Sequence, residues 1–199
     1  MNMSKNRIDF ELHVASERTH LSQVRRAFAD AVKIEAADPS MVNFLVVCCD
    51  YMIFSLRRLI EQDVVLHERL LPHVDSDDAE YQEKLKKLDT GLSSMETFIR
   101  NLENAKLQLV KSGLYGLHDF KKVANEFLDA FLTMLASNRH STYSLEKEVF
   151  QSSDWEAIAC ISEESIQSEK DLYHDVIISS PEGLNPRDYP PIGHQQAVE

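Results

Sequence analysis

Apolar residues recur every three or four positions along most of this chain, which is the spacing of one face of an α-helix. The first such segment runs from about Glu11 or Glu17 to Ala36, with an apolar face of Leu21, Val24, Phe28 and Val32. No run shows the alternation of apolar and polar residues typical of a half-buried strand. The pattern therefore predicts an all-α protein.

The second helix is apolar on nearly every side through its first half, in the run VNFLVVCCDYMIF that begins at Val42. Asp38 and Pro39 predict its start, as an N-cap followed by proline at the first helical position. Pro72 predicts its end. A helix that is apolar all round must be covered all round, so we expect it at the centre of a bundle or in a helix-helix dimer interface. Asp50, inside this run, is expected to form a hydrogen bond with a group on a neighbouring helix or to lie at a water-accessible interface between helices.

Three further helices are predicted. An acidic run from Asp75 opens the third, and Gly113 ends it. The fourth begins near Phe120 and continues toward Phe150. A capping box at Ser153 to Glu156 opens a fifth, which runs to about Ile177. The third helix carries its apolar residues at alternating spacings of three and four, as in near-parallel bundle packing: Leu85, Leu88, Leu92, Met95, Ile99 and Leu102.

These segments predict an up-down four-helix bundle with an additional C-terminal helix, whose expected role is to cover an apolar face of the second helix. We expect one helical domain over residues 11–178, because 199 residues suit one core better than two. Residues 1–10 are expected to be a flexible N-terminal segment. Residues 179–199 hold four of the six prolines and are expected to be an extended tail, ordered only where something holds it.

The net charge of −12 argues against nucleic acid and anionic lipid as partners, since both require a basic surface. Asp50 interrupts the longest apolar stretch, which is shorter than a bilayer core requires, so no membrane contact is expected. The three cysteines include one adjacent pair and form no disulfide framework. With no apolar signal segment at the N-terminus, these features favour a cytoplasmic protein.

Histidines and carboxylates on helices are the only candidate chemistry, because the common phosphate, nicotinamide, zinc-finger and hydrolase motifs are absent. No nucleophile with an adjacent base is found, so an enzyme is the less favoured reading. If consecutive helices pack antiparallel, Glu17, Arg58, Asp89 and His140 share one level, and His13 faces Gln62 and Asp63. Imidazole and carboxylate on facing helices are the ligands of metal-binding bundles. The candidate metal ligands are therefore His13, Asp63, Asp89 and His140.

Two segment ends resemble the hemerythrin-like, or HHE cation-binding, family. LHERLLPHV, with His67, Glu68 and Pro72, is similar to the end of that family's second helix, and RHSTYSLEKEVF to the end of its fourth. His20 matches the family's histidine near the start of the first helix. The resemblance implies an up-down bundle, iron as a possible cofactor, and His20, His67 and Glu68 as secondary candidate ligands. Gln62 and Leu66 stand where the family's His and Glu would stand.

Two functions follow from this resemblance. In the first, the chain is a divergent member that has lost part or all of the metal site and acts by binding a protein partner or a second copy of itself. In the second, it binds one or two metal ions and senses oxygen or redox state. If consecutive helices pack antiparallel, His20 and His67 lie about a dozen residues apart along the helix axis, on the order of 18 Å. This separation favours an ion-paired polar layer between the helices over a two-metal site.

Overall fold

The computed structural model describes residues 9–35, 38–74, 78–138, 143–159 and 162–190, without the side chains of 80–82, 84–93, 136–138 and 143–145. These residues form α-helices and short 3-10 turns, and no strand occurs among them. The prediction of an all-α protein is confirmed. The helices are α1 Phe10–Lys33, α2 Pro39–Leu70, α3 Ala79–Ser112, α4 Leu117–Asn138, α5 Tyr143–Val149, α6 Ser152–Ala159 and α7 Glu163–Ser179, with 3-10 turns η1 Leu71–His73, η2 Gly113–Gly116 and η3 Pro186–Asp188.

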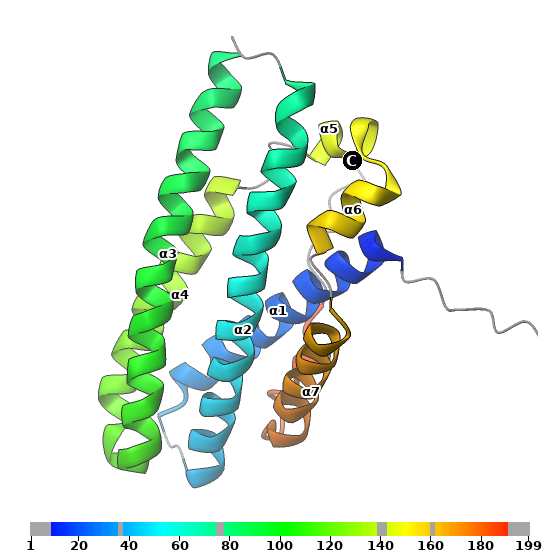
Figure 1. The fold of residues 1–199 in the computed structure, drawn as a ribbon. Helices are drawn as coiled ribbons and strands as arrows, with labels where there is room; N and C mark the ends of the chain where they lie inside the picture. The colour runs from blue at the N-terminus through cyan, green and yellow to red at the C-terminus, as the bar shows by residue number, and fades with distance from the viewer. Residues whose placement is uncertain (1–8, 36–37, 75–77, 139–142, 160–161, 191–199) are drawn as a thin grey trace, which may run out of the picture.

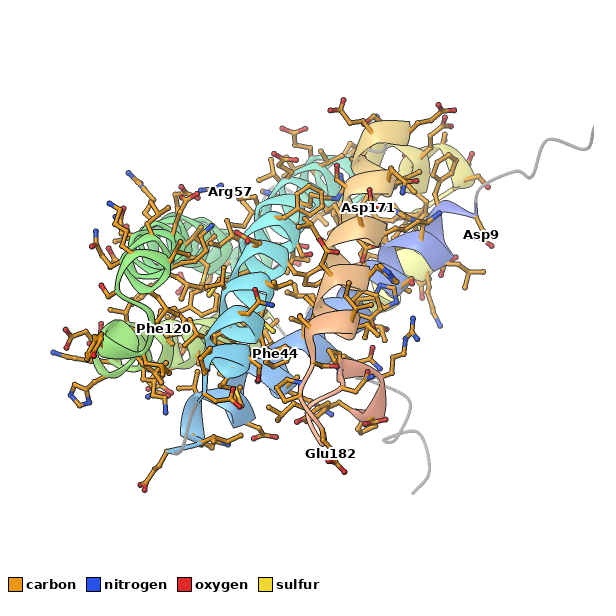
Figure 2. The ribbon with its side chains drawn as sticks, turned by 90° about the horizontal axis from the view of Figure 1, so that it is seen from below. Asp9, Phe44, Arg57, Phe120, Asp171 and Glu182 are labelled. Atoms are coloured by element: carbon orange, nitrogen blue, oxygen red, sulfur yellow. The ribbon has the colours of Figure 1, made fainter. Side chains whose placement is uncertain are left out.

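Helix α2 is the central element. It packs against α1, α3, α6 and α7, while α4 packs against α3 and α1 (Figure 1). Figure 1 shows α1 crossing obliquely behind α2, and α7 on the side of α2 away from α3 and α4. Figure 2 shows the same arrangement from below, with Asp171 marking α7. The prediction that a C-terminal helix packs over an apolar face of the second helix is confirmed.

The start and end signals of α2 act as predicted. The Asp38 side chain accepts hydrogen bonds from the backbone N–H groups of Ser40 and Met41, and α2 ends at Leu70, two residues before Pro72. Gly113 follows α3 with φ +56°, a conformation that costs glycine no steric strain. Asp50 Oδ1 lies 2.5 Å from Nζ of Lys106 on α3, so its predicted bond to a neighbouring helix is also confirmed.

Other predicted boundaries were wrong. The first helix ends at Lys33, because Ile34 is extended. The predicted fifth helix is two helices, since Ser162 is extended and caps the start of α7. The cap of α6 is formed by Asp154, whose side chain accepts from the backbone N–H of Gln151. The predicted continuation of the fourth helix crosses residues 139–142, which lie outside the described residues, and α5 lies beside α6 and out of line with α4 (Figure 1).

The apolar interior has two parts. The main core joins α1, α2, α3, α4 and α7, and its largest fully buried side chains include Tyr51, Phe28, Phe44, Phe120 and Phe127. A smaller core joins α1, α2 and α6 through Val14, Leu66, Leu70, Ile158 and Ala159. Residues 39–73 are long and apolar enough to cross a membrane, but 56% of the most apolar window is buried inside the protein. Such burial is typical of a core helix.

The chain after α7 turns back along α1. Leu184 and Pro186 are buried, and the backbone carbonyl of Tyr189 accepts a hydrogen bond of 2.8 Å from Nε2 of Gln23. The Tyr189 hydroxyl donates to Asp30, and Arg26 donates to the carbonyl of Pro190. The first part of the expected proline-rich tail is thus held by α1. Residues 191–199 and residues 1–8 of the expected N-terminal segment 1–10 lie outside the described residues, and the last two residues of that segment, Asp9 and Phe10, form the N-cap and start of α1.

Candidate functional site

A layer of polar side chains lies between the two apolar cores, where α1, α2 and α6 meet. Arg58 Nε donates to Glu17 Oε1 over 2.9 Å, and a terminal guanidinium nitrogen lies 3.3 Å from Glu17 Oε2. Gln62, one turn beyond Arg58, donates to the same Oε2 over 2.6 Å. The guanidinium also donates to the backbone carbonyl of Ala159 at the end of α6. A two-point contact of this kind is among the stronger hydrogen-bonded pairs in proteins.

Burial makes this layer energetically important, since Glu17, Arg58 and Gln62 are 8%, 8% and 2% exposed. A buried carboxylate needs a counter-charge or hydrogen-bond donors, and Arg58 and Gln62 supply both. The space left beside them, lined by Glu17, Ser55 and Arg58, is about 10 Å³, or roughly the room for one water molecule. The layer is therefore filled by its own side chains.

Asp63 lies next to this layer and is bound by a second arginine. Its Oδ1 accepts from a guanidinium nitrogen of Arg18 over 3.1 Å. Burial raises the pKa of Asp63; the positive charge of Arg18 opposes this shift, and the nearby carboxylate of Glu146 on α5 adds to it. Asp63 is thus a partly buried acid held between one cation and one further acid.

The predicted metal ligands do not gather into a site among the described residues. No group of three or more histidine, cysteine, aspartate or glutamate side chains there has the geometry to hold an ion. His13 Nε2 lies 3.3 Å from Glu17 Oε1, without the alignment of a hydrogen bond. His140 and the Asp89 side chain fall outside the described residues. His67 on α2 is half-buried, and Glu68 beside it is exposed.

The prediction of which residues share a level along antiparallel helices was correct for α1 with α2 and wrong for α2 with α3. Glu17 does pair with Arg58, and His13 and Gln62 both lie against Glu17. On the other side of α2, however, Arg57 pairs with Glu103. Position 89 of α3 is therefore displaced from the level of Arg58 by about a dozen residues, or on the order of 18 Å along the helix.

His20, one of the secondary candidates, belongs to a different cluster that joins α1, α2 and α7. Its Nδ1 lies 2.9 Å from Oε1 of Glu169, and the Tyr51 hydroxyl donates to the same oxygen over 3.0 Å. Burial by itself would raise the pKa of Glu169, which is 5% exposed. The bond and charge of His20, helped by Tyr51, outweigh burial and hold that pKa below its ordinary value.

Tyr173 completes this cluster from α7. Its ring stacks on the His20 imidazole at 3.9 Å between centroids with 11° between the planes. Its hydroxyl donates to Oε1 of Gln23, the same side chain that holds the carbonyl of Tyr189. Burial raises the pKa of Tyr173, and the nearby guanidinium of Arg187 partly offsets the shift. The cluster thus ties α7 and the chain after it to α1.

An open surface hollow lies over this cluster, where α1, α7 and η3 meet. Sequence reasoning named His20 but missed the rest, because Glu169 and Tyr173 come from the far end of the chain. The local signal available in α7 was its polar run EKDLYHD, which carries a single tyrosine, Tyr173. The hollow is lined by Thr19, His20, Gln23, Glu169, Lys170, Asp171, Tyr173, His174 and Arg187.

Comparison of the chain with models of protein families, with curated proteins and with solved structures finds no match.

Proposed function

We propose that this chain is a divergent hemerythrin-like helical protein that acts by binding a protein partner, with the family's metal site partly or wholly replaced by ion pairs. One observation carries the proposal. The two acidic side chains on the facing sides of α1 and α2, Glu17 and Asp63, are each paired with an arginine, Arg58 and Arg18. These guanidinium groups supply the positive charge that a bound cation would otherwise supply.

The proposal includes the architecture that the resemblance implies, an up-down four-helix bundle of α1 to α4 with α7 as the additional helix. The order of packing supports it, because α1 contacts α2, α2 contacts α3, α3 contacts α4, and α4 returns to α1. We further propose a cytoplasmic location and no dependence on nucleic acid or membrane. The acidic charge balance supports the first exclusion, and the burial of α2 supports the second.

Metal analysis tests the proposal most directly. The untagged protein is purified without chelator, its iron and zinc content is measured, and its thermal unfolding is compared before and after treatment with EDTA. We expect less than about a tenth of an ion per chain and an unchanged midpoint, because Arg58 and Arg18 occupy the cation positions.

The metal-binding alternative predicts the opposite result. It would be established by stoichiometric iron or zinc that is lost in folded His13→Ala and Asp63→Ala variants, with a lower midpoint after EDTA. Glu61→Ala is the matched control, since Glu61 is exposed on the same helix as Asp63 and is no candidate ligand. Light scattering on the same sample distinguishes a second copy of the chain from a different protein as the partner.

A further inference from the structure

We propose that the hollow between α1, α7 and η3 binds a carboxylate-rich segment of the protein partner. The inference rests on the proposed partner-binding function and names the surface and the chemistry it uses. Its walls come from three parts of the chain: Thr19 and His20 from α1, Lys170 and His174 from α7, and Arg187 from η3.

The acidic side chains of the hollow are already engaged by the protein. Glu169 accepts hydrogen bonds at Oε1 from His20 and Tyr51, and it is buried. Asp171 accepts from the Gln167 side chain over 2.7 Å. Each of these carboxylates thus has one oxygen bonded to donors of the protein itself.

The basic side chains of the hollow remain available. No hydrogen bond or ion pair joins Lys170 or His174 to another residue in the described part of the chain. Arg187 is exposed, although its guanidinium also interacts with Tyr173. His20 is held at Nδ1 by Glu169 and stacked on Tyr173, so its ring is fixed in the floor of the hollow. In a chain with 33 acidic and 21 basic residues, two exposed basic side chains at one hollow, Lys170 and Arg187, favour an anionic ligand.

The shape favours a peptide segment over a small molecule. Pockets for small ligands enclose most of the ligand and are lined mainly by apolar side chains. This hollow is open, and most of its lining side chains are polar or charged. Its floor is preformed, because Gln23 joins Tyr173 to the backbone of Tyr189 and so fixes η3 against α1. Little ordering is then required of the protein on binding.

The test uses the full chain and a fluorescein-labelled peptide of alternating glutamate and alanine, titrated by anisotropy at low and moderate salt. We expect saturable binding that weakens as salt rises, and no binding of the same peptide with glutamine in place of glutamate. Lys170→Glu and Arg187→Glu are each expected to weaken binding at least tenfold. Both side chains are exposed, so the variants should remain folded, which circular dichroism would check.

Lys111→Glu and Lys122→Glu are the matched controls, because these exposed lysines lie on α3 and α4 and make the same change of net charge. They should leave the dissociation constant within about twofold. Absence of saturable binding, or equal loss in the control variants, would overturn the proposal. Displacement of the peptide by millimolar inorganic phosphate would assign a simple anion site and also overturn it. Neither result bears on metal content, so failure here is distinct from failure of the proposed function.

Discussion

Arg58 of α2 meets Glu17 of α1 through two nitrogen-oxygen contacts, in a layer that separates the main core from the smaller one. Both side chains are less than a tenth exposed. Removing one member of such a pair leaves the other charge buried, whereas removing both does not. The layer is therefore a strong constraint on how α1 and α2 are aligned.

Arg58→Met and Glu17→Leu are each expected to lower the free energy of unfolding by about 3–5 kcal/mol. The double variant should lose less stability than the sum of the losses in the two single variants, because no unpaired charge remains. Urea unfolding of the four proteins gives the coupling energy. Arg57→Met is the control, since Arg57 pairs with Glu103 at the surface and should cost at most about 1 kcal/mol. Additive losses would contradict this account.

Glu169 should make the protein sensitive to acid. Its pKa is lowered in the folded state, so the ionised carboxylate stabilises the fold above the ordinary glutamate pKa of about 4.3. That contribution is lost as the pH falls through the lowered folded pKa. Glu169→Gln is thus expected to be less stable than the native protein at pH 7, with the difference shrinking by about pH 3.5. Urea midpoints at both pH values measure it.

A suitable comparison for Glu169 is Glu164→Gln, an exposed position on the same helix. Its effect should be small and nearly independent of pH. If Glu169→Gln lost the same stability at both pH values, the loss would reflect packing, and the His20–Glu169 ion pair would not explain it.

Asp63 should have the opposite effect. Burial, strengthened by Glu146, raises its pKa despite Arg18. Its contribution to stability is therefore fully present below the ordinary aspartate pKa of about 3.9 and is lost as the pH rises through the raised folded pKa. Asp63→Asn is expected to be at least as stable as the native protein at pH 7, with any advantage gone by about pH 4. Lower stability at pH 7 would mean that the Arg18 pair outweighs burial.

Cys48 and Cys49 should be unreactive in the folded protein. Both are fully buried, and burial raises the pKa of each thiol, so the reactive thiolate is scarce. We expect iodoacetamide to label neither at pH 8 within the time that fully labels the urea-unfolded chain. Peptide mapping by mass spectrometry measures the labelling of each. Rapid labelling of the native protein would show that α2 becomes exposed.

The sequence was sufficient for features that depend on neighbouring residues. Asp38 and Pro39 identified the start of α2, and the short turn between α1 and α2 allowed Glu17 to be matched with Arg58. Features that depend on distant contacts were not predictable in this way. The offset of α3 is seen only in its contacts with α2, such as that of Arg57 with Glu103. The contact of Glu169 with His20 spans 149 residues without any local pattern.

Helix α2 packs against α1 from the first part of the chain and α7 from the last part, so its surroundings are completed only late in synthesis. Tyr51 and Glu169 touch but are 118 residues apart, so the ribosome releases α2 long before α7 exists. Until then, the side of α2 that later meets α7 is an uncovered apolar surface, and such surfaces promote aggregation of nascent chains. Shortening the chain before α7 should therefore yield an aggregation-prone species and no smaller version of the same fold.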